Sequence, residues 1–405
     1  MTFDDALALD AADPLAFARA RFTLPDGLIY LDGNSLGALP AATPGAIAEV
    51  TERQWGGDLI TSWNKHGWID APTRVAALLA PIVGARPTEL LIADSTSVVL
   101  FKLLAAVVQA RPGRSVILSE EGNFPTDLYV AEGLAGLVPG LALKTVPAAE
   151  ITAAIDGDTA VVMLTHVDYR SGAVHDMAAV NAAAHAAGAL SLWDLSHSAG
   201  AVALDLNRDG CDLAVGCGYK YLNGGPGAPA FLFVAERLQS ELRSPLSGWM
   251  GHAEPFAFEP GHRPAAGIAR FLTGTPSILA IAALEAGLRT FDGIAMADVE
   301  AKSRALSRLF VGEVEARCGN ALRLASPAAR GSHVAFAHPQ AYAMMQALIA
   351  RGVIGDVRAP DLMRFGFAPL YNCFAEMWRA AEILADILAR GEWNQPRFRE
   401  RPRVT

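Results

Sequence analysis

The middle of the chain alternates short, almost wholly apolar runs with stretches that have the length and periodicity of helices. The apolar runs predict six strands: Ser115–Ser119, Leu141–Val146, Ala160–Thr165, Ala189–Asp194, Leu213–Gly216 and Ala230–Val234. Helical patterns occupy Thr96–Gln109, Thr126–Leu137 and Asp176–Ala187. Strands that are apolar on both faces and separated by helices are typical of a mostly parallel sheet with helices on both sides. We therefore expect an α/β fold.

The pattern changes after about residue 290. A helix at Leu279–Leu288 and a long helix at Asp298–Val314 lead into a mixed region. That region contains three predicted strands and two predicted helices: Leu322–Ala325, His333–Ala337, Arg364–Ala368, Ala341–Arg351 and Glu376–Arg390. We expect a large domain at 41–290 and a smaller α+β domain at 291–405, with the N-terminal segment 1–40 packing against the small domain.

Composition argues against several function classes. The net charge is −9 and no basic block occurs, which disfavours nucleic-acid binding. No run of about 18 apolar residues predicts a membrane span, and the acidic N-terminus does not resemble a secretory signal. Four scattered cysteines without a CxxC pair favour a cytoplasmic location. The nine histidines form no HExxH pair, so we expect no metal site.

Lysine is scarce in this chain, because only five of the 33 basic residues are Lys. Four of them, Lys65, Lys102, Lys144 and Lys302, are interpreted as exposed charges. Lys220 instead lies in the apolar, glycine-rich segment Gly-Cys-Gly-Tyr-Lys-Tyr-Leu-Asn-Gly-Gly. A buried lysine with a lowered pKa readily forms Schiff bases. The segment lacks the GxxxxGK[ST] spacing of a phosphate loop, so that reading is rejected.

Polar residues at strand ends are informative, because ligands of parallel sheets bind beyond the carboxyl ends of the strands. Asp194 ends one predicted strand, and Lys220 follows the next strand, one expected βαβ step later. A buried carboxylate needs a partner, and the protonated ring nitrogen of pyridoxal phosphate is a suitable one. An aspartate that caps the following helix is an equally acceptable reading of Asp194 alone.

Two further segments suit the same cofactor. Thr96 and Ser97 stand where a helix is predicted to begin, and hydroxyls and N–H groups at a helix N-terminus bind phosphate; a plain N-cap is the alternative. Phe124 precedes a helix start at Pro125 and is suited to stack on a pyridine ring. A phenylalanine of the core is the alternative for Phe124.

Six segments, in the right order and spread over nearly the whole chain, resemble class V of the fold type I pyridoxal-phosphate enzymes and, within it, the kynureninase family. They are Tyr30-Leu-Asp-Gly-Asn-Ser-Leu-Gly, Asn123-Phe-Pro-Thr-Asp, Asp194-Leu-Ser-His-Ser-Ala-Gly, Gly218-Tyr-Lys-Tyr-Leu-Asn-Gly-Gly-Pro-Gly, Gly248-Trp-Met-Gly-His and Arg364-Phe-Gly-Phe-Ala-Pro-Leu-Tyr-Asn. The resemblance implies an aspartate aminotransferase-like fold, with a mostly parallel sheet of the seven-stranded type in the large domain.

The resemblance also implies roles for individual residues. Lys220 is implied as the Schiff-base lysine, Tyr219 as a phosphate contact that assists proton transfer, and Asp194 as the partner of the ring nitrogen. The implied cofactor-binding set comprises Thr96, Ser97, Phe124, Pro125, Thr126, Asp127, Thr165, Asp194, His197, Tyr219, Lys220, Trp249 and Thr275. Trp249 and Thr275 are implied to come from a partner subunit, so a homodimer with a shared active site is expected.

The implied reaction is hydrolysis of L-kynurenine, or its 3-hydroxy form, to anthranilate or 3-hydroxyanthranilate and L-alanine, in tryptophan and kynurenine catabolism or NAD biosynthesis. Arg364 is implied to grip the substrate α-carboxylate, with Asn34 and Ser35 nearby, and the Gly274-Thr275 pair favours kynurenine. Asp168 receives no role. The alternatives are a cysteine desulfurase or selenocysteine lyase and a class V aminotransferase. Residues 331–339 lack the cysteine that a desulfurase needs.

Overall fold

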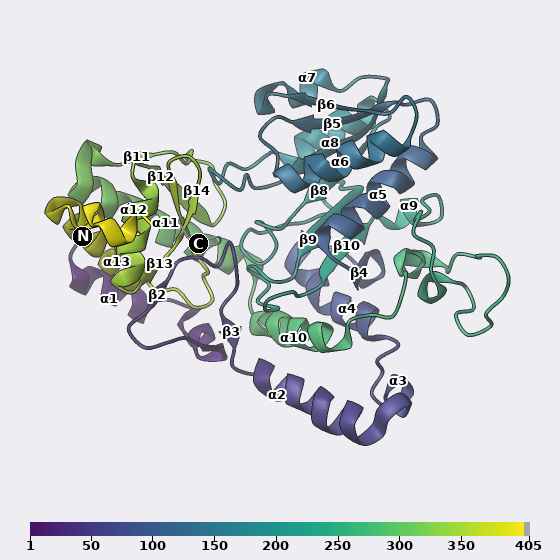
Figure 1. Cartoon of the computed structure of the whole chain (residues 1–405), viewed down its shortest axis with the longest axis horizontal. Helices are drawn as coiled ribbons and strands as arrows, with labels where there is room; N and C mark the ends of the chain where they lie inside the picture. The colour runs from purple at the N-terminus through teal and green to yellow at the C-terminus, as the bar shows by residue number, and fades with distance from the viewer. Residues whose placement is uncertain (401–405) are drawn as a thin grey trace.

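The protein, described here by a computed structural model over residues 1–400, is built around a seven-stranded sheet (Figure 1). The last five residues of the predicted small domain lie outside the described residues. The strand order is β4–β10–β9–β8–β7–β5–β6. The bounds are β4 (Leu90–Ala93), β5 (Val116–Glu120), β6 (Ala142–Val146), β7 (Thr159–Thr165), β8 (Leu190–Asp194), β9 (Leu213–Cys217) and β10 (Ala230–Val234).

Six of these strands run in one direction, and β10 runs antiparallel to its neighbours β9 and β4. The expectation of a mostly parallel sheet is therefore confirmed. The strand β4 was missed because its four residues form a short apolar run directly before a helix. The expected helix between β8 and β9 is wrong, because residues 195–212 form turns. The two strands still pair in parallel, so Asp194 and the residues after β9 lie at the same edge.

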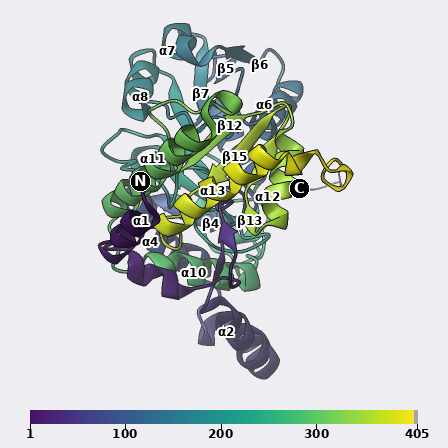
Figure 2. The ribbon, with the colours of Figure 1, turned by 90° about the vertical axis from the view of Figure 1, so that its left-hand side faces the viewer.

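Helices flank this sheet (Figures 1 and 2). Their bounds are α4 (Ala71–Val83), α5 (Thr96–Ala110), α6 (Pro125–Leu137), α7 (Ile151–Ala154), α8 (Met177–Ala186), α9 (Glu236–Gln239) and α10 (Ile278–Leu288). Every residue of β4, β7, β8, β9 and β10 is buried. These strands are apolar on both faces because helices exclude water from both sides.

A second apolar core is built by the C-terminal part of the chain. Its antiparallel sheet has the order β11–β12–β15–β14. The bounds are β11 (Arg323–Leu324), β12 (His333–Ala337), β14 (Asp356–Arg358) and β15 (Leu362–Gly366), with the helices α11 (Met296–Cys318), α12 (Ala341–Ala350) and α13 (Phe374–Arg390). The helices α11 and α13 lie side by side in Figure 2.

The N-terminal segment contributes to both cores. From this segment, α1 (Phe3–Ala11) packs on α13, and β2 (Ile29–Tyr30) pairs in parallel with β13 (Val353–Ile354). The short strands β1 (Phe22–Thr23) and β3 (Leu39–Pro40) pair with each other, and Phe22 belongs to the first core. The boundaries at about residues 40 and 290 stay predictions.

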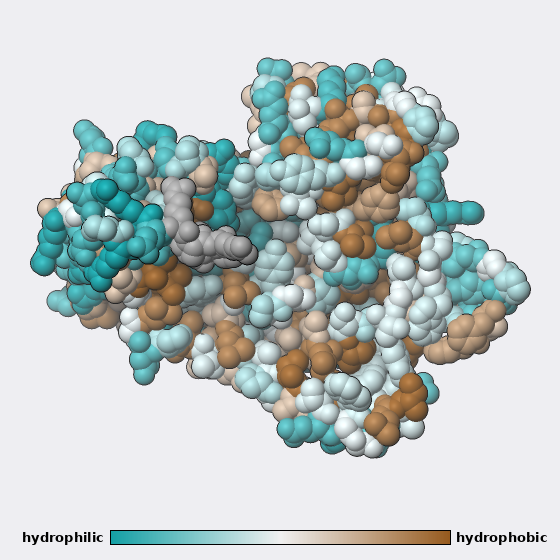
Figure 3. All heavy atoms as spheres, viewed as in Figure 1, coloured by the Kyte–Doolittle hydropathy of each residue, from teal (hydrophilic) through white to brown (hydrophobic). Residues whose placement is uncertain are grey.

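An arm projects from the lower side of the molecule in Figure 1. It consists of α2 (Thr43–Ala48), a π-helix over Glu49–Asp58 and the short helix α3 (Ser62–Lys65). Figure 3 shows apolar side chains gathered at its tip, around α3. Trp55, Leu59 and Ile60 are there 58%, 61% and 77% exposed. No helix within residues 1–400 is long and apolar enough to cross a membrane.

Candidate active site

Lys220 lies three residues beyond the end of β9, in a turn where its side chain is half-buried. Its Nζ lies 3.0 Å from Nε2 of His197. The same Nζ lies 5.9 Å from the ring centroids of both Phe124 and Tyr219. The structure thus brings three other predicted site residues around the amine of Lys220.

The N-terminal motif packs directly on the backbone of the lysine turn. The N–H of Gly37 donates to the carbonyl of Tyr219 at 2.8 Å. A Cβ at Gly37 would lie 2.4 Å from the carbonyl oxygen of Lys220, so only glycine fits this approach. The motif at residues 30–37 therefore supports the lysine as well as supplying side chains.

Two buried carboxyl groups face Lys220 from neighbouring elements. Asp194 ends β8 and is 4% exposed, and Asp127 lies in the first turn of α6 and is 2% exposed. The N–H and Oγ of Ser196 donate to Asp194 Oδ1 at 2.8 and 2.6 Å. Burial raises the pKa of Asp194 although Lys220 and Ser196 oppose the rise. Burial, and then the charge of Asp194, raise the pKa of Asp127 well above its usual value.

Asn123 connects the end of β7 to the backbone of Phe124. This role was not identified from the sequence. The Oδ1 of Asn123 accepts from the hydroxyl of Thr165 at 2.6 Å and from the N–H of Phe124 at 2.8 Å. The hydroxyl of Thr165 also lies 3.4 Å from Oδ2 of Asp127. The missed signal was the position of Asn123 as the first residue of the Asn-Phe-Pro-Thr-Asp motif, whose Pro125 and Thr126 begin α6.

Thr96 and Ser97 are the first two residues of α5, as predicted, and both are half-buried. The turn before them contains Asp94, whose φ of 49° is unusual for a residue other than glycine. Asp94 pairs with Lys102 at 2.5 Å, and Lys102 also donates to the carbonyl of Phe271 at 2.8 Å. The structure therefore fixes this helix N-terminus by an ion pair between the buried Lys102 and the solvent-accessible Asp94.

Two of the four lysines expected on the surface are buried, so those two expectations are wrong. Lys102 is fully buried, and Lys302 is 7% exposed and pairs with Asp13 at 2.6 Å. Each has a carboxylate partner, which is what makes burial of an ammonium group acceptable. Lys65 and Lys144 are exposed as expected.

Arg364 forms a second buried charge cluster beside the first. It lies in β15, is fully buried, and its Nε donates to Asp356 Oδ1 at 2.8 Å while Nη2 bonds Asp356 Oδ2. Its Nη1 donates to the carbonyl of Tyr169, and its Nη2 lies 3.3 Å from Ser35 Oγ. Ser35 in turn donates to Asp356 at 2.7 Å. The guanidinium is thus held on one edge by a carboxylate, and its other edge contacts two neutral oxygens.

Asp32 and Asn34, also from the N-terminal motif, lie near this cluster. The charges of Asp356 and Arg364 act on Asp32, and the Asn34 side chain packs on Gly366 at the end of β15. Both amide atoms of Asn34 and Oδ1 of Asp32 are buried and have no hydrogen-bond partner within the described chain. Burial, and then the charge of Asp356, raise the pKa of Asp32 to about 7. Burial also raises the pKa of Asp356, but Arg364 and Arg358 oppose this effect and bring the pKa below its usual value. Unfilled polar atoms of this kind are expected where a ligand binds.

Trp249 and Thr275 do not join the residues around Lys220. Trp249 packs edge-to-face on Phe256, with ring centroids 5.6 Å apart. Thr275 lines a mostly apolar cavity of about 440 Å³, with Trp55 and Trp63 from the arm and Trp68 just after it. Their assignment to the cofactor therefore stays a prediction that depends on a second subunit.

Pyridoxal phosphate fits the residues around Lys220. Two buried carboxyl groups face a single lysine amine, so a further positive group would be stabilised there. The phenyl ring of Phe124 lies close to that amine, and the N-terminus of α5 offers N–H groups and two hydroxyls to a phosphate. These groups have the chemistry that suits the nitrogen, the ring and the phosphate of the cofactor, respectively.

The cysteines are placed unfavourably for nucleophilic chemistry. Cys211 and Cys217 are buried, and burial raises the pKa of Cys318 to about 11 and of Cys373 to about 12. A thiol is reactive only as the thiolate. Residues 1–400 contain no group of His, Cys, Asp and Glu side chains that could hold a metal ion.

Comparisons with known proteins identify relatives of the chain. Residues 299–384 match the family model of the kynureninase C-terminal domain. The kynureninases of Pseudomonas fluorescens and Burkholderia mallei (strain SAVP1) are 51% and 52% identical to the chain. In both comparisons the match covers the full length of the chain and of the relative.

Solved structures of the same fold are more distant in sequence. A cysteine desulfurase from Thermococcus onnurineus NA1 has a TM-score of 0.79 at 18% identity and covers 93% of this chain and 98% of its own. A cystine C–S lyase in complex with cysteine persulfide has a TM-score of 0.77 at 19% identity, covering 89% and 98%. At this identity the likeness concerns the fold alone. Because curated relatives match over the whole chain, the protein belongs to the kynureninase family.

Proposed function

We propose that the protein hydrolyses L-kynurenine to anthranilate and L-alanine with pyridoxal phosphate as cofactor. The observation that carries the proposal is Lys220 beside the buried Asp194 and Asp127, in a chain that is 51–52% identical to two kynureninases over its full length. The raised pKa values of Cys318 and Cys373 argue against the desulfurase alternative.

Lys220 would hold the cofactor as a Schiff base, and Asp194 would bind the protonated ring nitrogen. Phe124 would cover one face of the ring, and Thr96 and Ser97 would bind the phosphate at the N-terminus of α5. When bound, the cofactor draws electrons away from the substrate α-carbon. Burial raises the pKa of both Asp127 and Asp194, which favours the protonated form and so lowers the repulsion between the two groups.

Arg364 is proposed to bind the α-carboxylate of the substrate. Asp356 holds the Nε–Nη2 edge of its guanidinium, which leaves the Nη1–Nη2 edge as the one that a carboxylate can approach. That edge now contacts the carbonyl of Tyr169 and the hydroxyl of Ser35. The substrate carboxylate would replace these neutral oxygens. Asn34, whose buried amide atoms have no partner within the described chain, packs on Gly366 at the end of the same strand as Arg364.

Proton transfer is assigned to Lys220 and Tyr219. The amine of Lys220 would take the proton from the substrate α-carbon, and the resulting ammonium would donate to His197 Nε2 at the contact already present. Burial raises the pKa of Tyr219 above its usual value. Its phenol is therefore protonated at neutral pH and can donate a hydrogen bond near Lys220.

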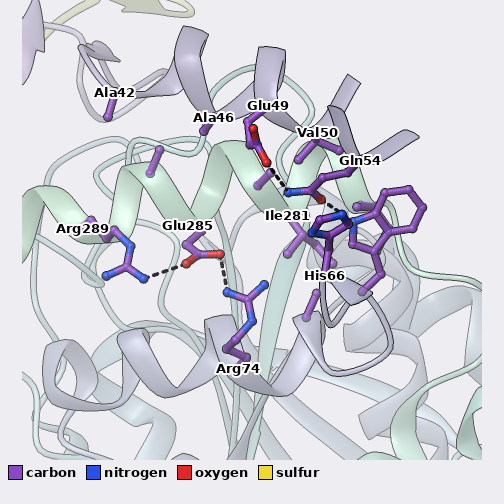
Figure 4. A pocket seen from close by; sticks show the side chains of 15 residues that line it. Ala42, Ala46, Glu49, Val50, Gln54, His66, Arg74, Ile281, Glu285 and Arg289 are labelled. Carbon is purple, nitrogen blue, oxygen red and sulfur yellow. Dashed lines mark hydrogen bonds and ion pairs between the residues drawn. The ribbon is translucent and has the colours of Figure 1, made fainter. Parts of the chain in front are cut away.

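A homodimer with a shared active site is part of the proposal. Thr275 borders a cavity walled by Trp55, Trp63 and Trp68, and exposed apolar residues extend along the tip of the arm. Aromatic residues on an exposed face are typical of subunit interfaces. A second, smaller groove lies between the arm and the helices α4 and α10, with a volume of about 270 Å³, and Arg74, Glu285 and Arg289 form a polar row along it (Figure 4).

Mixed dimers test the sharing of sites. Lys220→Ala and Trp249→Ala, each inactive alone, should regain about a quarter of wild-type activity when they are unfolded, mixed and refolded together. Half of the dimers would be hybrids, and each hybrid would contain one intact site. No recovery, although light scattering confirms dimers, would mean that Trp249 serves its own subunit.

A cytoplasmic location in tryptophan breakdown, or in supply of NAD precursors, is also proposed. Its support is that the four cysteines are free thiols, as reducing compartments maintain them. Fluorescence of a tagged protein in intact and fractionated cells would test the location.

The direct test of the activity uses the purified, cofactor-loaded protein with L-kynurenine, and with L-cysteine in parallel. Fluorescent anthranilate from kynurenine, without sulfide from cysteine, would support the proposal. Sulfide without anthranilate would move the protein to desulfurase chemistry. The 3-hydroxy substrate, assayed under the same conditions, gives the preference that the Thr275 position predicts.

A further inference from the structure

Three imidazole nitrogens near Lys220 are buried without a partner in the part of the chain that the structure describes. They are Nδ1 of His197 and both ring nitrogens of His333. A neutral imidazole has one donor and one acceptor, and leaving either unfilled in the interior is costly. The two rings are neighbours, with centroids 5.4 Å apart and planes at 54°.

The contact with Lys220 determines which nitrogen of His197 carries the proton. An ammonium group has three donors and no acceptor. When Lys220 is protonated, Nε2 of His197 at 3.0 Å must therefore accept, and the ring proton must lie on Nδ1. Nδ1–H is then a donor that needs an acceptor, and the unfilled nitrogens of His333 belong to the adjacent ring.

We propose that His333 is a positioning residue of the active site, which accepts a hydrogen bond from His197 Nδ1–H and so holds Nε2 of His197 toward Lys220. The chain Lys220–His197–His333 would close by a small rotation of the two rings. It favours the protonated amine, which is the form that Lys220 takes after it has removed a proton from the substrate. This inference rests on the proposed function.

The surroundings of His333 suit an acceptor that stays neutral. Burial, and then the positive charges of Arg364, Lys220 and Arg358, lower its pKa to about 3, against a smaller opposing effect of Asp356. His197 is held neutral by burial and by Lys220, His333, Arg364 and Arg358, which lower its pKa well below the usual value. Neither ring competes with Lys220 for a proton at neutral pH.

The position of His333 in the fold makes this contact a link between the two cores. His333 begins β12 in the C-terminal sheet, whereas His197 follows β8 of the large sheet. The ring of His333 packs on Gly172, where an added Cβ would lie 3.4 Å from Nε2 and 2.8 Å from the carbonyl of His333. With a φ of 78°, Gly172 allows the chain to pass close to the histidine.

Nitrogen NMR of the wild-type protein tests the hydrogen bond directly. We would label histidine with ¹⁵N and assign His197 and His333 from the variants, in cofactor-free and cofactor-loaded protein. The expected result for the cofactor-free protein is His197 protonated at Nδ1 only, with a coupling across the hydrogen bond to a nitrogen of His333. A His197 ring protonated at Nε2 only, or a coupling to neither nitrogen, would overturn the proposal.

Two substitutions separate positioning from packing. His333→Gln keeps a side-chain acceptor, and His333→Leu keeps bulk without one. Loss of one hydrogen bond predicts that kcat for kynurenine falls roughly tenfold in His333→Leu with KM little changed, and that His333→Gln restores most of it. Equal losses in both variants, or a wild-type kcat in His333→Leu, would contradict the assignment.

His338, directly after the other end of β12, provides a control. It is half-exposed and contacts Trp393, so His338→Gln should leave kcat unchanged. Anthranilate production as a function of pH gives a further readout. We expect the acidic limb of the kcat profile to move in His333→Leu and not in His338→Gln, while a limb that moves in neither variant counts against a role for His333 at Lys220. A failure of wild-type protein to cleave kynurenine would refute the proposed function and leave the NMR result interpretable.

Discussion

The active-site region contains two pairs of buried carboxyl groups, and the two pairs differ in the number of positive charges that neutralise them. Asp127 and Asp194 share one nearby cation, Lys220, and burial raises the pKa of both. Asp32 and Asp356 face two guanidiniums, and only Asp32 has a raised pKa. The first pair therefore lacks a positive group, whereas the second already has its cations.

The difference separates a cofactor end from a substrate end. A protonated ring nitrogen would supply the cation that the first pair lacks. The second pair fixes Arg364, and a substrate carboxylate has only to replace neutral oxygens on its free edge. The cofactor end is thus suited to bind a cation, and the substrate end is suited to bind an anion.

The largest expected effect comes from removing the single cation of the first pair. Lys220→Ala should lower the rate of anthranilate formation by at least roughly 10³-fold, because both the covalent link and the proton acceptor are lost. Absorbance of the lysine-linked cofactor should disappear as well. Normal turnover in this variant would break the comparison, since the chemistry would then not depend on the cofactor end.

A smaller effect is expected at the substrate end. Arg364→Lys keeps the charge but loses the two-pronged contact, which is worth about 2 kcal/mol, so KM for kynurenine should rise roughly 30-fold while kcat changes less. Arg351→Lys is a matched control, because Arg351 pairs with Asp386 and Glu392 outside the site. If KM of Arg364→Lys stays within twofold of the wild type, the arginine does not bind the carboxylate.

The smallest effect concerns Asp32, the member of the second pair whose pKa is raised. The folded protein raises the pKa of Asp32 to about 7, so it favours the protonated form. That contribution to stability is complete below about pH 4 and is lost as the pH rises through 7. Asp32→Asn should therefore be more stable than the wild type by roughly 1–2 kcal/mol at pH 8.5 and nearly equal at pH 4. Urea unfolding at both pH values measures this, and parallel stability curves would show that Asp32 is ionised throughout.

The large sheet was predictable because most of its strands are apolar on both faces, and all six predicted strands match within one residue at each end. The strand β4 was missed because only pairing with β10, far along the chain, makes its short run a strand. The helix expected between β8 and β9 was wrong because parallel pairing usually, but not always, uses a helix.

The motifs pointed to the residues around Lys220, whose roles stay predictions, but they could not show which side chains would pair. Nothing in sequence showed that Lys102 would bury its ammonium against Asp94 or that Asp356 would hold Arg364. These pairings depend on side chains that tertiary folding brings together. The roles of Trp249 and Thr275 depend further on a second subunit.

The parallel pairing of Ile29–Tyr30 with Val353–Ile354 has a consequence for synthesis on the ribosome. At about 5–20 residues per second, β2 emerges tens of seconds before its partner strand exists. The motif that follows β2 supports the backbone of Lys220, so a strand pairing that can form only late in synthesis anchors the support of the lysine turn. Shortened products of early termination would lack this anchor, even when the large sheet has folded.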